Sequence, residues 1–177
     1  MKLIAKITDE DIGEKMVEMN NPFHRKASRG IVFDNEGNIA VFFKKNKNMY
    51  KLPGGGLEEN ESFEEAFIRE VREEVGCEVQ IIECLGYIEE YKTKSNYIQT
   101  SYVFIGKIVN KLENLELTRM EQDEGGERLW LTPEQTLIRM KENYYNLKAS
   151  KYTNLYSTKI VAKRDIKILE TYLNTKN

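Results

Sequence analysis

The chain has 177 residues, of which 40% are hydrophobic and 32% are charged, and its formal net charge at pH 7 is −2. A length of this order suits one domain with at most a modest extension, and the composition is that of a soluble globular protein rather than a disordered one. The near-neutral charge predicts no bulk attraction to nucleic acid or to a membrane surface.

The cysteines and the N-terminus predict a soluble protein of a reducing compartment. No apolar run reaches the ~18 residues of a membrane-spanning helix, and the opening MKLIAKITDED meets acidic residues too early for a signal peptide. Cys77 and Cys84 make no disulfide framework, so we expect a cytoplasmic setting. With His24 as the one histidine, a zinc site is not expected. Its neighbours Pro22 and Phe23 favour a loop position for His24 over a catalytic one.

The first residues predict a strand and then a short helix. Residues 2–7 alternate in polarity like a strand. Residues 8–21 are acidic and carry Ile12, Met16 and Met19 at helical spacing, and an Asn-Asn-Pro sequence breaks this pattern.

Three β-rich runs follow. Residues 27–33 and 39–44 are strand candidates, and the intervening Asp-Asn-Glu-Gly-Asn sequence predicts a hairpin turn. Residues 50–52 form a third, shorter candidate that leads into a run of three glycines.

The second half of the chain predicts three more strands and two helices. The strand candidates are 78–88, 99–109 and 128–131, and the polar residues 89–96 join the first two of these as a hairpin. Proline at 133 starts a helix that extends to about 143. A last helix covers 157–173, with Ile160, Ile166, Leu169 and Leu173 on one stripe.

The stretch 52–79, LPGGGLEENESFEEAFIREVREEVGCEV, combines a glycine loop with a charged helix. Ser62 and Glu65 have the form of a capping box, which predicts a helix start at Ser62, and Gly76 marks its end. At about 100° per residue, three glutamates fall within one third of the helix circumference. These are Glu70, Glu73 and Glu74. A neighbouring arc can face a core and consists of Phe67, Ile68, Val71 and Val75.

Three carboxylates at this spacing repel one another unless a positive charge lies among them. A hard divalent cation that prefers oxygen ligands would resolve the conflict. The alternative to a metal site is a solvated helix that is stabilised by ion pairs, such as that of Arg69 with Glu73.

The same stretch resembles the signature of the Nudix family. The matching positions are Gly55, Glu61, Arg69, Glu70, Val71, Glu73, Glu74 and Gly76. The one departure is Cys77, where the family usually has a bulky aliphatic residue. Because cysteine behaves as a small hydrophobe, this change perturbs packing slightly and leaves the chemistry intact.

Strands around a central helix, followed by closing helices, indicate an α/β protein with a mixed sheet between helices. The resemblance implies the Nudix α/β/α sandwich and covers roughly residues 27–140. We expect residues 1–177 to form a single Nudix domain in which 143–177 is a helical extension.

The acidic helix face is the candidate metal site. Breaking a phosphate anhydride needs cations to neutralise negative charge and an oriented water. Glu70 and Glu74 are the first choice as ligands of Mg²⁺ or Mn²⁺, with Glu73 as a third. By resemblance, the backbone carbonyl of Gly54 adds another ligand. The three glycines allow close approach of metal and phosphate to the backbone, so we expect a phosphate-binding loop at Gly54, Gly55 and Gly56.

The candidate catalytic residues are Glu73, Glu124 and Arg69. We expect Arg69 to pair with Glu61 and to fix the loop against the helix, which is a positioning role. The resemblance implies that a glutamate of the loop ahead of Trp130 activates water. Glu124, beside two glycines, is preferred, and the alternates are Glu121 and Glu127; an ordinary solvated loop is the other interpretation.

By resemblance, the substrate is a nucleoside diphosphate linked to a further group X. The signature does not specify which group X is. The absence of proline between Pro53 and Pro133 disfavours ADP-ribose by resemblance. Aromatic side chains could stack on a base, although strand aromatics are more often core residues. These aromatics are Phe42, Tyr87, Tyr91 and Tyr97. Basic residues up to Arg164 are interleaved with tyrosines in 143–164, with no acidic residue, which predicts either a border of the cleft or a packing helix. The candidate substrate-binding residues are Lys44, Tyr97, Lys148 and Lys151.

By resemblance, the chain is a metal-dependent pyrophosphohydrolase of a nucleotide or nucleotide-like metabolite. The alternative is a non-catalytic Nudix-fold module that binds a nucleotide, although such a module need not keep three glutamates. An isomerase on the same fold would usually have a longer chain and a catalytic cysteine, for which Cys77 is badly placed. The expected partner is a small-molecule nucleotide, with no membrane or nucleic acid; the sequence leaves a homodimer open.

Overall fold

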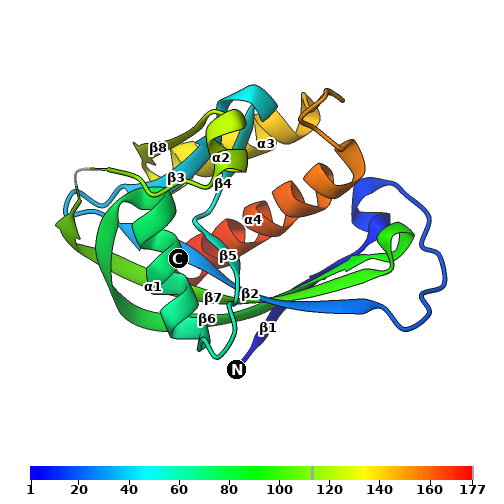
Figure 1. Cartoon of the computed structure of the whole chain (residues 1–177), viewed down its shortest axis with the longest axis horizontal. Helices are drawn as coiled ribbons and strands as arrows, with labels where there is room; N and C mark the ends of the chain where they lie inside the picture. Colours follow the sequence, from blue (N-terminus) through cyan, green and yellow to red (C-terminus); the bar gives the residue numbers. More distant parts are fainter. Residues whose placement is uncertain (113, 177) are drawn as a thin grey trace.

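The computed structural model describes residues 1–112 and 114–176, and its centre is a mixed β-sheet (Figure 1). The strand order is β1-β6-β7-β2-β3-β4, with β5 paired to β2 and β8 paired to β3. The strands are β1 Leu3–Ile7, β2 Phe23–Phe33, β3 Ile39–Lys44, β4 Met49–Lys51, β5 Gly54–Gly56, β6 Cys77–Lys92, β7 Tyr97–Lys111 and β8 Gly126–Leu131. The pairs β1–β6 and β2–β7 are parallel, and the other pairs are antiparallel.

Helices cover both faces of this sheet. They are α1 Phe63–Val75, α2 Arg119–Asp123, α3 Pro133–Tyr145 and α4 Leu155–Lys176, with short 3₁₀ turns η1 Asp9–Ile12, η2 Lys45–Lys47 and η3 Thr93–Ser95. On one face, Phe67 and Val71 of α1 pack against Phe104 of β7. On the other face, Ile160 and Leu169 of α4 belong to a second apolar cluster. The expected α/β/α arrangement with a mixed sheet is therefore confirmed (Figure 1).

Helix α1 begins and ends where the sequence predicts. The Ser62 side chain accepts a hydrogen bond from the Glu65 backbone, the Glu65 side chain accepts one in return, and Gly76 ends the helix in the left-handed region at φ 63°. Its core-facing side consists of Phe67, Val71 and Val75, all buried. Ile68, which we expected on that side, is 42% exposed because it falls just outside the buried stripe. Cys77 is buried in the same cluster and acts as the small hydrophobe that the sequence predicts.

Two predictions for the N-terminal region are wrong. The expected helix at 8–21 is only the 3₁₀ turn η1, because Gly13 ends it in the left-handed region at φ 78° and Met16 is exposed. His24 lies in β2 rather than in a loop, because the parallel pairing of β2 with β7 starts at Phe23 opposite Tyr97.

The other predicted strands and helices are present, with shifted or longer ends, but one strand and one α-helix were not predicted. The glycine run 54–56 is strand β5 because it pairs with β2, and residues 119–123 form α2, which begins at a capping box of Thr118 and Glu121.

The hairpin between β2 and β3 is closed by Asp34, whose carboxylate accepts hydrogen bonds from the backbone of Glu36 and Asn38. Strand β6 extends to Lys92 and α4 starts at Leu155, because sheet pairing and the core stabilise residues whose sequence is polar. In residues 1–112 and 114–176, no helix has the length and apolar character that crossing a membrane requires.

Candidate active site

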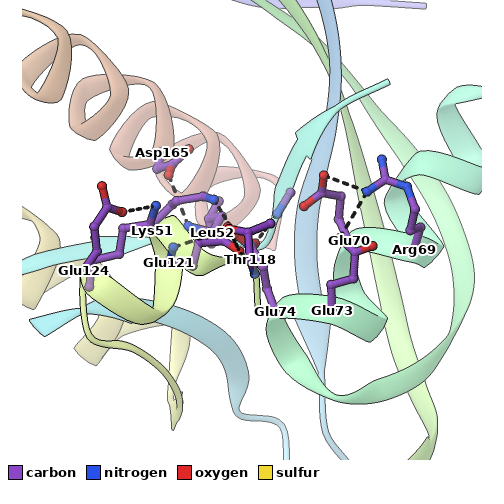
Figure 2. A network of polar contacts seen from close by, with 12 residues as sticks. Lys51, Leu52, Arg69, Glu70, Glu73, Glu74, Thr118, Glu121, Glu124 and Asp165 are labelled. Atoms are coloured by element: carbon purple, nitrogen blue, oxygen red, sulfur yellow. Dashed lines mark hydrogen bonds and ion pairs between the residues drawn. The ribbon is translucent and has the colours of Figure 1, made fainter. Parts of the chain in front are cut away.

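A cavity of about 420 Å³ lies beside the glycine strand β5. Its walls come from the strands β2 to β7, from α1 and α4, and from the turn η2 and the segment around α2, and all three glycines of β5 line it. The lining includes three carboxylates, those of Glu70, Glu74 and Glu121. Figure 2 shows the polar contacts that connect this region, from Arg69 on α1 to Glu124 beyond α2. The predicted metal ligands Glu70 and Glu74 and the three glycines therefore lie at one cavity.

Glu74 is the most deeply buried carboxylate of the lining, with 1% exposure. Its Oε1 lies 2.6 Å from Nζ of Lys51, and its Oε2 accepts a hydrogen bond of 2.8 Å from the Gly54 backbone. Burial raises the pKa of Glu74, and the charge of Lys51 opposes this shift. Helix α1 is thus attached through Glu74 to both β4 and β5.

Glu70 lies one turn before Glu74 and against Gly55. A side chain on Gly55 would overlap the Glu70 carboxylate, so this approach requires glycine. Oε1 of Glu70 is 3.1 Å from Nη1 of Arg69. Burial raises the pKa of Glu70, while Lys51 and Arg69 act in the opposite direction.

Arg69 connects α1 to the segment after β5 without lining the cavity. Its guanidinium donates two parallel hydrogen bonds to Glu61, of 2.8 and 3.0 Å, and a third of 2.9 Å to the Gly56 carbonyl. Arg69 also contacts Glu73 at 3.1 Å (Figure 2). This is the ion pair that a solvated helix without a metal was expected to have. The arrangement is that of a positioning residue.

The donor set of the cavity suits a hard divalent cation. Glu70 and Glu74 both line the cavity, and Gly55 leaves the Glu70 carboxylate room that any other residue would fill. Carboxylate oxygens are the ligands that Mg²⁺ and Mn²⁺ prefer. Within residues 1–112 and 114–176, no three His, Cys, Asp or Glu side chains gather in a metal-binding group. Glu73 is turned to Arg69 instead, and it does not join the other two glutamates in the lining.

The three loop glutamates occupy different environments. Glu124 is buried, with Oε2 2.7 Å from Nζ of Lys44 and Oε1 2.5 Å from Nζ of Lys47. Burial acts to raise its pKa, but the hydrogen bonds from the two lysines outweigh burial and lower it. Glu121 lines the cavity and caps α2 through Thr118, whereas Glu127 is exposed on β8. Which of them acts as a base stays a prediction.

Two of the four candidate substrate-binding residues line the cavity, and two lie elsewhere. Lys44 and Tyr97 line the cavity. Lys148 lines a separate hollow near η2, and Lys151 lies over the ring of Tyr152 at 4.7 Å. Of the other aromatics, Phe42 is buried, and neither Tyr87 nor Tyr91 is among the lining residues.

Several cations of the lining were not predicted as site residues, although Arg164 belongs to the basic stretch that was expected to border the cleft. They are Arg25, Arg29, Lys47, Lys51, Lys92 and Arg164. Arg164 lies on α4, so the C-terminal segment does border the cavity, through residues other than Lys148 and Lys151. The available signal was Arg29, a charge within the otherwise uncharged run ASRGIVF of β2.

Comparisons with known proteins agree on one family. Residues 23–151 match the model of the NUDIX domain. A MutT-like protein from Streptomyces ambofaciens is 31% identical over 123 residues, which are 70% of this chain and 73% of the relative. Among solved structures, a NUDIX hydrolase from Nitrosomonas europaea aligns with a TM-score of 0.62 at 16% identity, over 88% of this chain and 92% of that one. The MutT protein from Methanosarcina mazei Go1 aligns with a TM-score of 0.54 at 16% identity, over 90% of this chain and all of that one (100%).

Proposed function

The chain belongs to the Nudix family and is a Nudix hydrolase, and from this premise we propose that it cleaves a nucleoside diphosphate linked to a further group X, with Mg²⁺ or Mn²⁺. The observation that carries the proposal is the convergence of Glu70, Glu74 and Gly55 at one cavity. Enzymes of this family generally use divalent metals, and the two carboxylates are the oxygen donors in this lining that suit one.

Glu70 and Glu74 would hold the cation, and the Gly54 carbonyl remains the expected further ligand. A bound divalent cation neutralises phosphate charge and lowers the pKa of a bound water. The glycines of β5 admit the diphosphate close to the backbone. Lys51, which pairs with Glu74, and Lys44, which pairs with Glu124, line the same cavity and would add positive charge near the anhydride oxygens.

Among the loop glutamates, we favour Glu121 as the base that accepts the proton of the attacking water. It lines the cavity, whereas both oxygens of Glu124 are occupied by lysines. A base needs access to the water and a pKa that is not depressed, and Glu124 lacks both in this arrangement. Arg69 acts through Glu61 and Gly56, by holding the segment after β5 against α1.

A substrate panel tests this function. Nucleoside triphosphates, nucleotide sugars, ADP-ribose and dinucleoside polyphosphates are each incubated with Mg²⁺ or Mn²⁺, and phosphate is measured after phosphatase coupling. We expect at least one compound to be hydrolysed, and EDTA to abolish the reaction. Saturable binding of a nucleotide with no turnover in any metal would instead identify a non-catalytic module.

A further inference from the structure

Arg29 is a buried cation whose hydrogen-bonding groups are not satisfied by the protein. It lies on β2 with 2% exposure, and its Nε and Nη1 atoms have no partner in the described part of the chain. Buried polar side chains of native proteins are nearly always hydrogen-bonded. The two buried guanidinium nitrogens beside a cavity are therefore expected to bind a group from outside the chain, either an ordered water or a ligand.

The nearby carboxylates face other cations. Oε2 of Glu90 lies 2.9 Å from Nη1 of Arg164, and Asp165 lies 2.8 Å from Nε of Arg164. Oε1 of Glu90 forms an ion pair with Nζ of Lys92 at 3.3 Å but has no hydrogen-bond partner in the described part of the chain. Arg29 itself forms no ion pair within residues 1–112 and 114–176. Burial and the charge of Arg164 lower the pKa of Arg29 to about 10, so its charge persists at neutral pH.

Arg29 belongs to the side of the cavity that faces α4. The charges that act on it most strongly are those of Arg164, Asp165 and Glu90, and Glu74 acts more weakly. Lys92 and Thr158 line the same cavity from β6 and α4. In the sheet Arg29 also pairs with Gly54, whose backbone binds Glu74, so the guanidinium is placed to meet an anionic group of a ligand in this cavity.

Charge at the lining is nearly balanced once the partners of its cations are included. The lining cations are Arg25, Arg29, Lys44, Lys47, Lys51, Lys92 and Arg164, and the lining carboxylates are Glu70, Glu74 and Glu121. Three further carboxylates outside the lining, Glu90, Glu124 and Asp165, pair with four of these cations, which leaves a formal excess of one positive charge. Arg25 donates a hydrogen bond to Gln99, so Arg29 is the lining cation that lacks a side-chain partner in the described part of the chain.

We propose that Arg29 anchors an anionic group of the ligand that enters this cavity, a phosphate or a carboxylate. The planar guanidinium of arginine binds either oxyanion through two parallel hydrogen bonds. That this ligand is the substrate rests on the proposed hydrolase function, whereas the anion site itself does not.

The test is calorimetric titration of the full chain in EDTA with two probes, tripolyphosphate for phosphate and citrate for carboxylate. We expect at least one probe to bind, and Arg29→Met to weaken it at least about tenfold, as loss of a charge-assisted pair does. Arg139→Met, at an exposed position on α3, is the control and should bind like the wild type. The probe that responds identifies the anion. No binding of either probe to the wild type, or equal affinities for wild type and Arg29→Met, would overturn the proposal.

Stability separates binding from a structural role. Because Arg29 makes no hydrogen bond or ion pair within the described residues and acts on Glu90 only through its charge, Arg29→Met should lower the Tm less than Arg164→Met, which strands Glu90 and Asp165. A lower Tm for Arg29→Met with unchanged affinity would overturn the proposal. If Arg29→Met does not fold, Arg29→Lys decides, since it keeps the charge and loses the fork; unchanged affinity in that variant would also overturn it. The assay contains no metal and needs no turnover, so failure of the hydrolase assignment leaves this result interpretable.

Discussion

Nζ of Lys51 lies 2.6 Å from Oε1 of Glu74, and both side chains are almost fully removed from solvent. Lys51 thereby supplies the positive charge that the buried Glu74 requires at the end of β4. If a divalent cation binds Glu74, it takes over part of this role, so the lysine and the metal stabilise the same carboxylate.

Lys51→Met tests this shared role. Removing the lysine leaves a buried carboxylate without its cation, which typically destabilises by about 3–5 kcal/mol. We expect a lower Tm in EDTA, and a larger rise of Tm on adding Mn²⁺ than in the wild type. The exposed Lys167→Met is the matched control and should behave like the wild type. An Mn²⁺ response equal to that of the wild type would count against metal binding at Glu74.

Arg69→Lys tests the positioning role of Arg69. Lysine cannot reproduce two parallel hydrogen bonds to Glu61 together with the one to the Gly56 carbonyl. We expect a loss of about 1–3 kcal/mol in the free energy of urea unfolding, and a lower kcat. Arg72→Lys, whose side chain is 61% exposed, should change neither. A fully stable and fully active Arg69→Lys protein would exclude the role.

The signature and its helix were predictable because their determinants are local. The capping box of Ser62 and Glu65 and the terminating Gly76 fix α1 within a few residues, and the spacing of the glutamates follows from the helix alone. The environment of Glu124 was not predictable, because Lys44 and Lys47 reach it from another strand and turn. The same holds for Arg29, whose isolation depends on α4 supplying Arg164 to Glu90. Local sequence predicts the helices and strands, whereas contacts between distant segments determine which charged side chains have an ion-pair partner.

Protonation of Glu90 should make the free energy of unfolding depend on pH in the acidic range. Burial acts to raise its pKa, but the charges of Arg164, Lys92 and Arg29 outweigh burial and lower it from 4.5 to about 2. A depressed carboxyl pKa contributes stability that is complete above the unfolded value and lost as the pH falls toward the folded one. We therefore expect the free energy of unfolding to fall between about pH 4.5 and 2, measured by urea titration.

Glu90→Gln should lower stability at pH 7 by about 3–5 kcal/mol, because Arg164 then lacks a buried partner. It should also flatten the decline below pH 4.5. Glu83→Gln, at an exposed position of the same strand, should reproduce the wild-type profile. An unaltered acid profile in Glu90→Gln would show that other groups control acid unfolding.

The general base can be assigned by comparing three glutamine variants. Glu121→Gln keeps the cap of α2 and removes the base, so kcat should fall by about a hundredfold or more with little change in Tm. Glu124→Gln removes the partner of Lys44 and Lys47, so its main effect should be a lower Tm. Glu127→Gln, on the exposed side of β8, is the control. A large loss of kcat at unchanged Tm in Glu124→Gln alone would transfer the role to Glu124.

The most direct test of the metal-dependent hydrolase account is the hydrolysis rate of Glu70→Gln and Glu74→Gln at saturating Mg²⁺, on the best compound of the substrate panel. Each variant keeps the size of the side chain and removes the charge that would hold the cation. Glu64→Gln, at an exposed position of α1, is the control for changes in the helix, and circular dichroism verifies that each protein is folded. The account predicts a rate near the wild type for Glu64→Gln and a fall of at least about a hundredfold for the other two. Wild-type rates in both Glu70→Gln and Glu74→Gln would contradict it.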